Sequence, residues 1–223
     1  MKYNIIIPYR KRKEHLNEFI TRFTGFIKEN QLDIQIYVIE QLGADPFNRG
    51  ALLNIGFLEA CVTRPEGLMI FHDVDLYPTY WGSIRYEPRP HEVRHPIGTP
   101  LENVGGICCC WKKEYELVNG HPSYAGWGKE DTTFRSRLER HGIPIDETDI
   151  VPLYDTKRCY APSHSRNVFM EGESCRRNTE AYHQEMATGL STNGLSSLSY
   201  NVYGRYDSME YVHHMIVEIM KND

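Results

Sequence analysis

The chain has 223 residues, of which 40% are hydrophobic, 25% charged and 12% aromatic, and its formal net charge is -5 at pH 7. These proportions are ordinary for one large domain or two small ones, and they exclude a disordered chain and a collagen-like repeat. Because binding to duplex nucleic acid requires basic residues that neutralise phosphates, the acidic balance argues against nucleic acid as a partner. It leaves room for a local basic pocket.

The hydrophobic runs of the chain are short. The first, Ile5–Ile7, is far too short for a signal peptide or a membrane helix. No later run approaches the roughly 20 apolar residues that are needed to span a bilayer. We therefore expect a chain without a transmembrane segment that is soluble and located in the cytoplasm.

The six cysteines are more consistent with free thiols than with disulfides or a zinc site. Three of them, Cys108–Cys110, are consecutive within an apolar, strand-like run. The chain is also large enough to hold a core without covalent cross-links. Structural zinc sites use spaced pairs such as C-x-x-C, and no such pair occurs. We expect mostly buried, free thiols.

Short β-rich runs alternate with helical patterns in the first half. Such alternation is typical of an α/β fold with a mainly parallel sheet covered by helices. Ligands bind at the carboxyl ends of parallel strands, where Pro8–Arg12 and Asp73–Asp75 fall. The expected elements are strands at Tyr3–Ile7, Ile34–Ile39 and Leu68–Phe71 and helices at 11–29 and 47–62.

The second half is more irregular. Residues 78–100 are rich in proline, but they also carry Tyr80, Trp81 and Tyr86, which indicates an ordered excursion and not a linker. The polar, weakly periodic stretch 155–178 is expected to be a loop. The remaining expected elements are a strand at 105–111, helices at 132–141 and 180–189, and a terminal strand pair at 198–203 and 211–219.

The segment Asp73-Val74-Asp75 follows an apolar strand and suggests a metal site. In extended backbone, carboxylates two residues apart point to the same side. Two such charges repel each other unless a cation lies beside them, and their hard oxygens suit Mn²⁺ or Mg²⁺. The alternative is that the aspartates cap a helix or a turn.

Gly126-Trp127-Gly128-Lys129-Glu130-Asp131 is a second candidate site segment. Glycines allow the backbone to approach a ligand closely, and the face of Trp127 could cover a sugar ring. Glu130 or Asp131 is placed to accept a proton. The alternative is helix capping by the acids, with Trp127 in the core.

A basic, aromatic loop at 8–12 follows the first strand, and Phe47-Asn48-Arg49 follows the second. Arginine forks and aromatic planes suit a nucleotide, since they provide bidentate contacts to phosphate and stacking for the base. Solvent-exposed turns are the simpler explanation for Lys11 and Arg12, but a poorer one for Arg10 and Arg49, which lie among apolar residues.

A fourth feature, Ser163-His164-Ser165-Arg166, lies in the late polar stretch. An isolated histidine is more often structural than a metal ligand, and the chain has ten histidines. His164 is therefore a candidate metal ligand only when it is considered together with the other three features.

Taken in order, these segments resemble the β-1,4-galactosyltransferase family, glycosyltransferase family 7. Phe-Asn-Arg at 47–49, Asp-Val-Asp at 73–75 and Gly-Trp-Gly-x-Glu-Asp at 126–131 are together very specific. The resemblance covers essentially the whole chain. It runs through residues 5–10, 47–57, 71–76, 104–106, 119–120, 126–131, 158–159, 164–166 and 194–200.

The resemblance implies a GT-A type, Rossmann-like fold over 1–223. Residues 1–100 would be the half that binds the nucleotide sugar, and residues 101–223 the acceptor-binding and catalytic half. The implied reaction is an inverting transfer of a hexose, galactose first of all, from a UDP-sugar to a hydroxyl of a carbohydrate or glycoconjugate acceptor. Mn²⁺ is the implied cofactor, with Mg²⁺ as the alternative.

Carried over position by position, the resemblance assigns roles to individual residues. Asp131 would be the general base, with Glu130 as a second catalytic residue. Asp75 and His164 would bind the metal. The acceptor would contact Gly128, Lys129, Glu130 and Asp131. The donor would contact Pro8, Tyr9, Arg10, Arg12, Phe47, Asn48, Arg49, Asp73, Val74, Asp75, Gly106, Trp127 and His164.

Four positions depart from the family pattern. Ala161 and Ser163 stand where a third metal ligand often precedes the histidine, and Ala125 replaces a tryptophan, which implies a wider acceptor pocket. Asn103 replaces a tyrosine and leaves room for an N-acetyl group, so UDP-GalNAc, UDP-glucose and UDP-xylose stay open as donors. The rivals from other classes are a non-catalytic carbohydrate-binding protein on the same fold and a metal-dependent phosphohydrolase.

Overall fold

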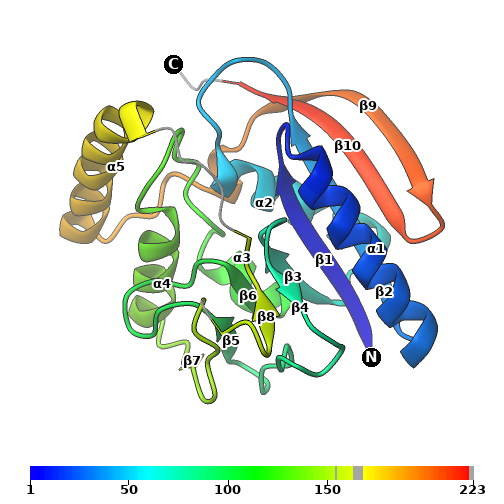
Figure 1. The fold of residues 1–223 in the computed structure, drawn as a ribbon. Coiled ribbons are helices and arrows are strands. Elements are labelled where there is room, and N and C mark those ends of the chain that lie inside the picture. Colours follow the sequence, from blue (N-terminus) through cyan, green and yellow to red (C-terminus); the bar gives the residue numbers. More distant parts are fainter. Residues whose placement is uncertain (154, 163–167, 221–223) are drawn as a thin grey trace.

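An eight-stranded sheet crosses the protein, with helices on both faces (Figure 1). The computed structural model describes residues 1–153, 155–162 and 168–220. The strand order is β7-β5-β6-β3-β1-β2-β10-β9. The strands are β1 (Lys2–Tyr9), β2 (Asp33–Gln41), β3 (Leu68–His72), β5 (Val93–Ile97), β6 (Ile107–Cys110), β7 (Ile145–Asp146), β9 (Tyr200–Met209) and β10 (Val212–Ile219).

The centre of the sheet is parallel, as the alternating sequence pattern predicts. Strand β1 pairs in parallel with β2 and β3, and β10 pairs in parallel with β2. The outer pairs β3–β6, β5–β6 and β9–β10 are antiparallel. The carboxyl ends of β1, β2 and β3 therefore meet at one edge of the sheet, where loops can bring side chains together.

Alternate residues of β1 enter two separate cores. Ile5 and Ile7 pack on the face covered by α1 (Lys13–Asn30), together with Phe19 and Phe23. Ile6 packs on the opposite face, with helices α2 (Arg49–Thr63), α3 (Lys112–Leu117) and α4 (Glu130–Arg140). Both faces are buried, which is why Ile5–Ile7 of β1 is a continuous apolar run and does not alternate with polar residues.

The cysteines are free, as expected. Cys108, Cys109 and Cys110 form most of β6 and are buried, and Cys159 is buried as well. Burial raises the pKa of the Cys108 thiol and of its two neighbours well above the ordinary value. These thiols act as small apolar side chains of the core.

The expectation of a loop over 155–178 is wrong in its second part. Helix α5 (Val168–Thr188) occupies residues 168–188, and the short strand β8 (Cys159–Tyr160) pairs with β4 (Tyr77–Pro78). The buried side chains of α5 include Ser174, Asn178 and Glu185, which share one face at helical spacing. Because that face is polar, the hydrophobic periodicity used to find helices is absent.

Polar contacts hold α5 against α4. Two parallel hydrogen bonds of 2.7 Å join Arg137 Nε and Nη2 to the two carboxylate oxygens of Glu185. Arg137 is fully buried and also donates to the carbonyl oxygens of Gly120 and Asn193. This guanidinium ties α4, α5 and two loops into one unit.

We expect Glu185→Gln to lower the free energy of unfolding by about 3 kcal/mol, because it leaves the buried Arg137 charge without a counter-charge. Urea unfolding at pH 7 measures the effect. Glu180→Gln is the matched control, since Glu180 pairs with Arg176 on the exposed face of the same helix and should cost below about 0.5 kcal/mol. Equal losses in both variants would contradict the interpretation.

Candidate active site

Side chains from three strand ends and from α4 meet at the carboxyl edge of the sheet. Arg12 lies just beyond β1, Arg49 opens α2 after β2, and Asp73 comes directly after β3. Glu130 and Asp131 are the first residues of α4, in the second half of the chain. Contacts through Arg49 join these segments.

Arg49 bridges two carboxylates. Its Nε donates to Asp73 Oδ1 at 2.7 Å, and its Nη1 donates to Asp131 Oδ1 at 2.5 Å. The Arg49 side chain is only 13% exposed, so these charged hydrogen bonds are weakly screened by water. The guanidinium thus fixes the carboxylate of Asp131 relative to the end of β3.

Burial and mutual repulsion shift the carboxyl groups around Arg49. Burial is the main cause that raises the pKa of Asp73 to about 6, against the lowering effect of Arg49. Burial and the charge of Asp131 raise the pKa of Glu130 to about 7. Burial disfavours the Arg49 cation, but the charges of Asp131 and Asp73 outweigh this and hold its pKa above the ordinary value. Such shifted acids are typical of functional sites.

Asp75 offers a hard oxygen donor beside this cluster. Its Oδ2 accepts a hydrogen bond from Arg12 Nη1 at 2.5 Å, and its side chain is 16% exposed. A carboxylate at the open edge of a sheet suits Mn²⁺ or Mg²⁺, so the residue fits the predicted metal. The second predicted ligand, His164, lies outside the described residues. Within the described ranges, no group of three or more His, Cys, Asp or Glu could hold a metal ion.

The segment before α4 has an unusual backbone. Gly126, Gly128 and Lys129 all have positive φ, at 83°, 106° and 70°. A Cβ on Gly126 would lie 2.4 Å from Ser174 Cβ of α5, so the close approach to α5 requires glycine. Lys129 adopts the left-handed conformation although it is not a glycine. Its Nζ lies 5.3 Å from the centre of the Tyr182 ring.

Helix α5 holds Trp127 by its backbone and leaves the indole exposed. The Trp127 amide donates to Ser174 Oγ, and Asn178 Nδ2 donates to the carbonyl oxygens of Trp127 and Gly128. Trp127 as a whole residue is 52% exposed. Trp127 is therefore not a core residue, and its ring is available to cover a ligand. Ser174 and Asn178 were missed by the sequence analysis because they fall in the stretch expected to be a loop.

Gly105 and Gly106, which directly precede β6, approach the site. A Cβ on Gly105 would lie 2.6 Å from Asp131 Oδ2, so this position leaves the space that the carboxylate occupies. Gly106 has a φ of 79°, and its carbonyl oxygen accepts a hydrogen bond from the Asp73 amide. Both glycines thereby support the two carboxylates that Arg49 bridges.

The predicted donor residues of the first loop separate into two groups. Pro8 and Tyr9 end β1 and are buried, with the Tyr9 ring edge-on to His214 at 5.9 Å between centres. Arg10 reaches outward, where its Nη1 donates to the Asp45 carbonyl and its guanidinium carbon lies 5.3 Å from the centre of the Phe47 ring. Arg10 and Phe47 form the cation–aromatic pair that a base could join.

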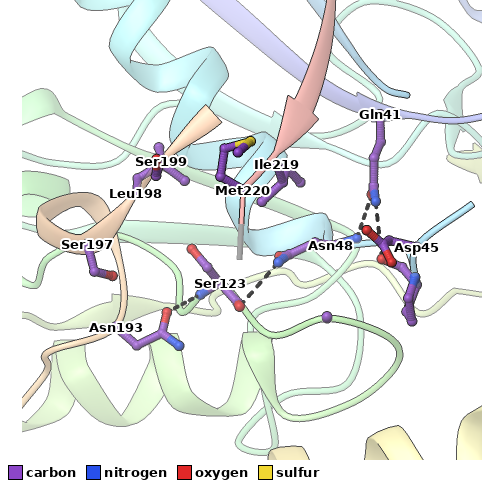
Figure 2. A pocket seen from close by; sticks show the side chains of 12 residues that line it. Gln41, Asp45, Asn48, Ser123, Asn193, Ser197, Leu198, Ser199, Ile219 and Met220 are labelled. Carbon is purple, nitrogen blue, oxygen red and sulfur yellow. Dashed lines mark hydrogen bonds between the residues drawn. The ribbon is translucent and has the colours of Figure 1, made fainter. Parts of the chain in front are cut away.

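Asn48 is a structural link as well as a predicted donor residue. Its Oδ1 caps α2 by accepting from the Ala51 amide, and its Nδ2 donates to the Ser123 carbonyl. A pocket of about 280 Å³ lies beside it, lined in part by Gln41, Asn193 and Met220 (Figure 2). Of the predicted site residues, only Asn48 is among those that line this pocket, so the pocket lies outside the carboxylate cluster.

Val74 is buried in the core on the α1 side and separates Asp73 from Asp75. The structure thus brings Arg49, Asp73, Glu130 and Asp131 together, and places the Arg12–Asp75 pair at the same edge.

Among the described residues, no helix is long and apolar enough to cross a membrane.

Comparisons with known proteins point to one family. Residues 1–81 match the family described as the N-terminal region of glycosyl transferase group 7, and residues 97–165 match the one described as the N-terminal domain of galactosyltransferase. The chain is 35% identical over 209 residues to β-1,4-galactosyltransferase 1 of Mus musculus, which covers 90% of this chain and 51% of that protein. The chain spans about half the length of the curated relatives it matches.

Solved structures agree in fold. A mutant of Drosophila β-1,4-galactosyltransferase 7 in complex with manganese, UDP-Gal and xylobiose superposes with a TM-score of 0.78 at 23% identity. The catalytic domain of the same enzyme with xylobiose gives 0.75 at 25% identity. Both cover 100% of this chain and 94% of the other. The fold is therefore of the GT-A type, as the resemblance implies.

Glu130→Gln should flatten the pH dependence of stability. The pKa of Glu130 is about 7 in the folded protein against 4.5 ordinarily, so the folded state binds more protons between these values. Stability of the unmodified protein should therefore fall as pH rises from about 5 to about 7. Urea unfolding at pH 5, 6, 7 and 8 measures this slope, which should be shallower in the variant. Identical slopes would contradict the raised pKa.

Proposed function

Because the chain belongs to glycosyl transferase group 7, the β-1,4-galactosyltransferase family, we propose that it is an inverting, metal-dependent glycosyltransferase. It transfers galactose from UDP-galactose to a hydroxyl group of an acceptor sugar and forms a β linkage. The observation that carries the proposal is the Asp131 carboxylate, which Arg49 holds at the start of α4. Asp131 lies four residues beyond the exposed Trp127 of the glycine-rich segment.

Asp131 is the proposed general base. The acceptor hydroxyl loses its proton to the Asp131 carboxylate while its oxygen attacks the anomeric carbon of the sugar. The bond from that carbon to the diphosphate breaks on the opposite face, and its electron pair leaves with UDP. Attack opposite the leaving group converts an α-linked donor into a β-linked product. Glu130, Gly128 and Lys129 lie next to Asp131 and contact the acceptor.

The donor binds along the strand ends. Arg10 and Phe47 hold the base, and Arg12 and Arg49 are the cations nearest to the phosphates. Asp73 contacts the ribose and the sugar, and Val74, whose side chain is buried, lies against the nucleotide through its backbone. Pro8, Tyr9, Asn48 and Gly106 shape the backbone beneath. Trp127 covers the sugar and shields it from water, which limits hydrolysis of the donor.

Asp75 and His164 are the residues that would hold Mn²⁺, which when bound would supply Lewis-acid stabilisation for the negative charge on the diphosphate. The hard carboxylate of Asp75 supports this assignment, and Mg²⁺ is the alternative ion. The Drosophila enzyme that shares the fold was crystallised with manganese, UDP-Gal and xylobiose. Residues 1–100 would provide most donor contacts and residues 101–223 the acceptor and the base.

Galactose is the favoured donor sugar because the relatives are named β-1,4-galactosyltransferases. The Asn103 side chain accepts a hydrogen bond from the Gly105 amide at 2.9 Å, and it is smaller than a tyrosine at this position. UDP-GalNAc therefore belongs in any donor test, with UDP-glucose and UDP-xylose. A cytoplasmic location stays a prediction from the sequence, which fractionation of the native source cells would test.

UDP release should be fastest with UDP-galactose and Mn²⁺, slower with Mg²⁺ and absent with EDTA. The assay uses the four donors above against mono- and disaccharides that include xylobiose.

Asp131→Asn should lower turnover by about 10²- to 10⁴-fold and leave UDP affinity nearly unchanged, since only the proton acceptor is lost. Asp149→Asn is the control, because Asp149 is an exposed carboxylate that pairs with Arg158. Unchanged turnover in Asp131→Asn would remove its role as base.

Asp75→Ala should remove the part of UDP affinity that depends on Mn²⁺. Loss of one of two protein ligands is expected to weaken metal-dependent binding at least about tenfold. Isothermal titration with UDP, with and without Mn²⁺, measures this directly. Asp207→Ala removes an exposed carboxylate on β9 and should leave the metal effect intact. If Asp75→Ala kept the full metal effect, the ligand assignment would be wrong.

A further inference from the structure

His121 lies buried directly behind the carboxylate cluster. Its ring stacks on Phe134 of α4, with centres 4.0 Å apart and planes at 22°, and it meets the Phe71 ring edge-on at 5.4 Å. Its exposed fraction is zero. The ring is therefore held in one orientation by aromatic packing, and both of its nitrogens must be accounted for inside the protein.

The hydrogen bonds around Asn54 fix which nitrogen of His121 carries the proton. Asn54 Nδ2 donates to the His121 carbonyl oxygen, so Asn54 Oδ1 is the atom that accepts from the Tyr115 hydroxyl at 2.6 Å. Tyr115 has one proton, and it is used in that bond. Its oxygen can then only accept from His121 Nδ1, which lies 2.9 Å away. His121 Nδ1 carries the hydrogen, and Nε2 carries a lone pair.

That lone pair faces Asp131. His121 Nε2 is 3.9 Å from Asp131 Oδ1, and within the described part of the chain it has no hydrogen-bond partner. Burial lowers the pKa of His121 well below its ordinary value, and the charges of Arg49 and Arg137 lower it further, so the ring stays neutral. A buried acceptor thus points at the carboxylate that accepts from Arg49, and this carboxylate has a hydrogen to donate only after it takes up a proton.

We propose that His121 is a positioning residue that accepts a hydrogen bond from Asp131 once this carboxyl has taken the proton of the acceptor hydroxyl. The inference rests on the proposed role of Asp131 as base. It gives the orphaned nitrogen a partner at the one stage of the reaction when Asp131 becomes a donor. The neutral acid is then stabilised, and the carboxylate is a stronger base than it would be beside a hydrocarbon ring.

The step needs little movement and balances in protons. The O–H bond of the acceptor breaks, the proton goes to an Asp131 oxygen, and His121 gains only a hydrogen bond. Closing from 3.9 Å to an ordinary hydrogen-bond length requires a shift of about 1 Å. A half-turn about the Cβ–Cγ bond of Asp131 brings either oxygen to face Nε2. The negative charge that Asp131 loses appears on the departing UDP as the acceptor oxygen bonds to the sugar, and no other side chain of the protein changes its charge.

Other groups facing Asp131 cannot take this role. Arg49 of α2 is already a donor to Asp131, and Asp73 after β3 is engaged with the same guanidinium. The Cys108 thiol of β6 has a pKa raised by burial and stays protonated, and Glu130 repels Asp131 when ionised. Arg137 and Tyr115, which face the far side of His121, are committed to other bonds.

The test compares three variants of His121 by the pH profile of turnover. His121→Phe keeps the stacked ring and removes Nε2, so the acidic limb of the profile should move about one pH unit lower and turnover at pH 8 should fall about tenfold. His121→Asn keeps a donor at the Nδ1 position only and should resemble His121→Phe. His121→Gln places an oxygen at the Nε2 position and should recover most of both effects.

Thermal melting and UDP titration of each variant establish that the fold and the donor site persist. An acidic limb in folded His121→Phe that coincides with the limb of the unmodified enzyme would overturn the proposal. A recovery in His121→Gln no greater than in His121→Asn would overturn it as well, because a merely structural role does not distinguish the position of the acceptor atom.

A second readout separates this inference from the proposed function. Carboxyl ¹³C NMR of aspartate-labelled protein follows the titration of Asp131 without any turnover, and the pKa of Asp131 should be lower in His121→Phe. If the unmodified protein releases no UDP from any donor, the proposed function fails and this measurement still decides the role of His121. If Asp131→Asn abolishes transfer but His121→Phe leaves this pKa unchanged, only the inference fails.

Discussion

The Arg49 guanidinium lies between two carboxylates that come from opposite halves of the chain. Asp73 directly follows a central strand and Asp131 lies in the first turn of a late helix, and both accept hydrogen bonds from this one side chain. Without the cation, Asp73, Glu130 and Asp131 would repel one another in a poorly hydrated space. The position of the proposed base, and the closeness of donor and acceptor regions, therefore depend on this single buried charge.

The fold places that charge by securing the start of α2 from two directions. The Asn48 amide donates to Gln41 Oε1 at the end of β2, and the Asn48 side chain donates to the Ser123 carbonyl in the second half. The helix therefore begins at a fixed distance from the sheet and from the loop that leads to α4 (Figure 1). Because Arg49 is the first residue of α2, its position is fixed in the same way.

Apolar patterning predicted the central strands and helices α1 and α2. Strands buried on both faces are continuous apolar runs, and helices packed on the sheet carry apolar residues at helical spacing. It could not predict most of α5, whose inward face carries Ser174, Asn178 and Glu185. Arg49 and Asp73 were foreseeable from motifs that follow strands, and Glu130 and Asp131 from the glycine-rich segment before α4. His121 was not, since an isolated histidine in a turn-rich segment shows its significance only through the tautomer that Tyr115 imposes. His164 lies outside the described residues.

Gly105 has no side chain, no charge and no predicted contact with a substrate, yet Asp131 Oδ2 lies only 2.6 Å from the place where its Cβ would stand. Even alanine at this position would push the proposed base away from Arg49. In a saturation mutagenesis library selected for transfer, position 105 should therefore tolerate as few replacements as the acid itself. A genetic screen would then identify a backbone position as essential, although chemistry alone would never nominate it.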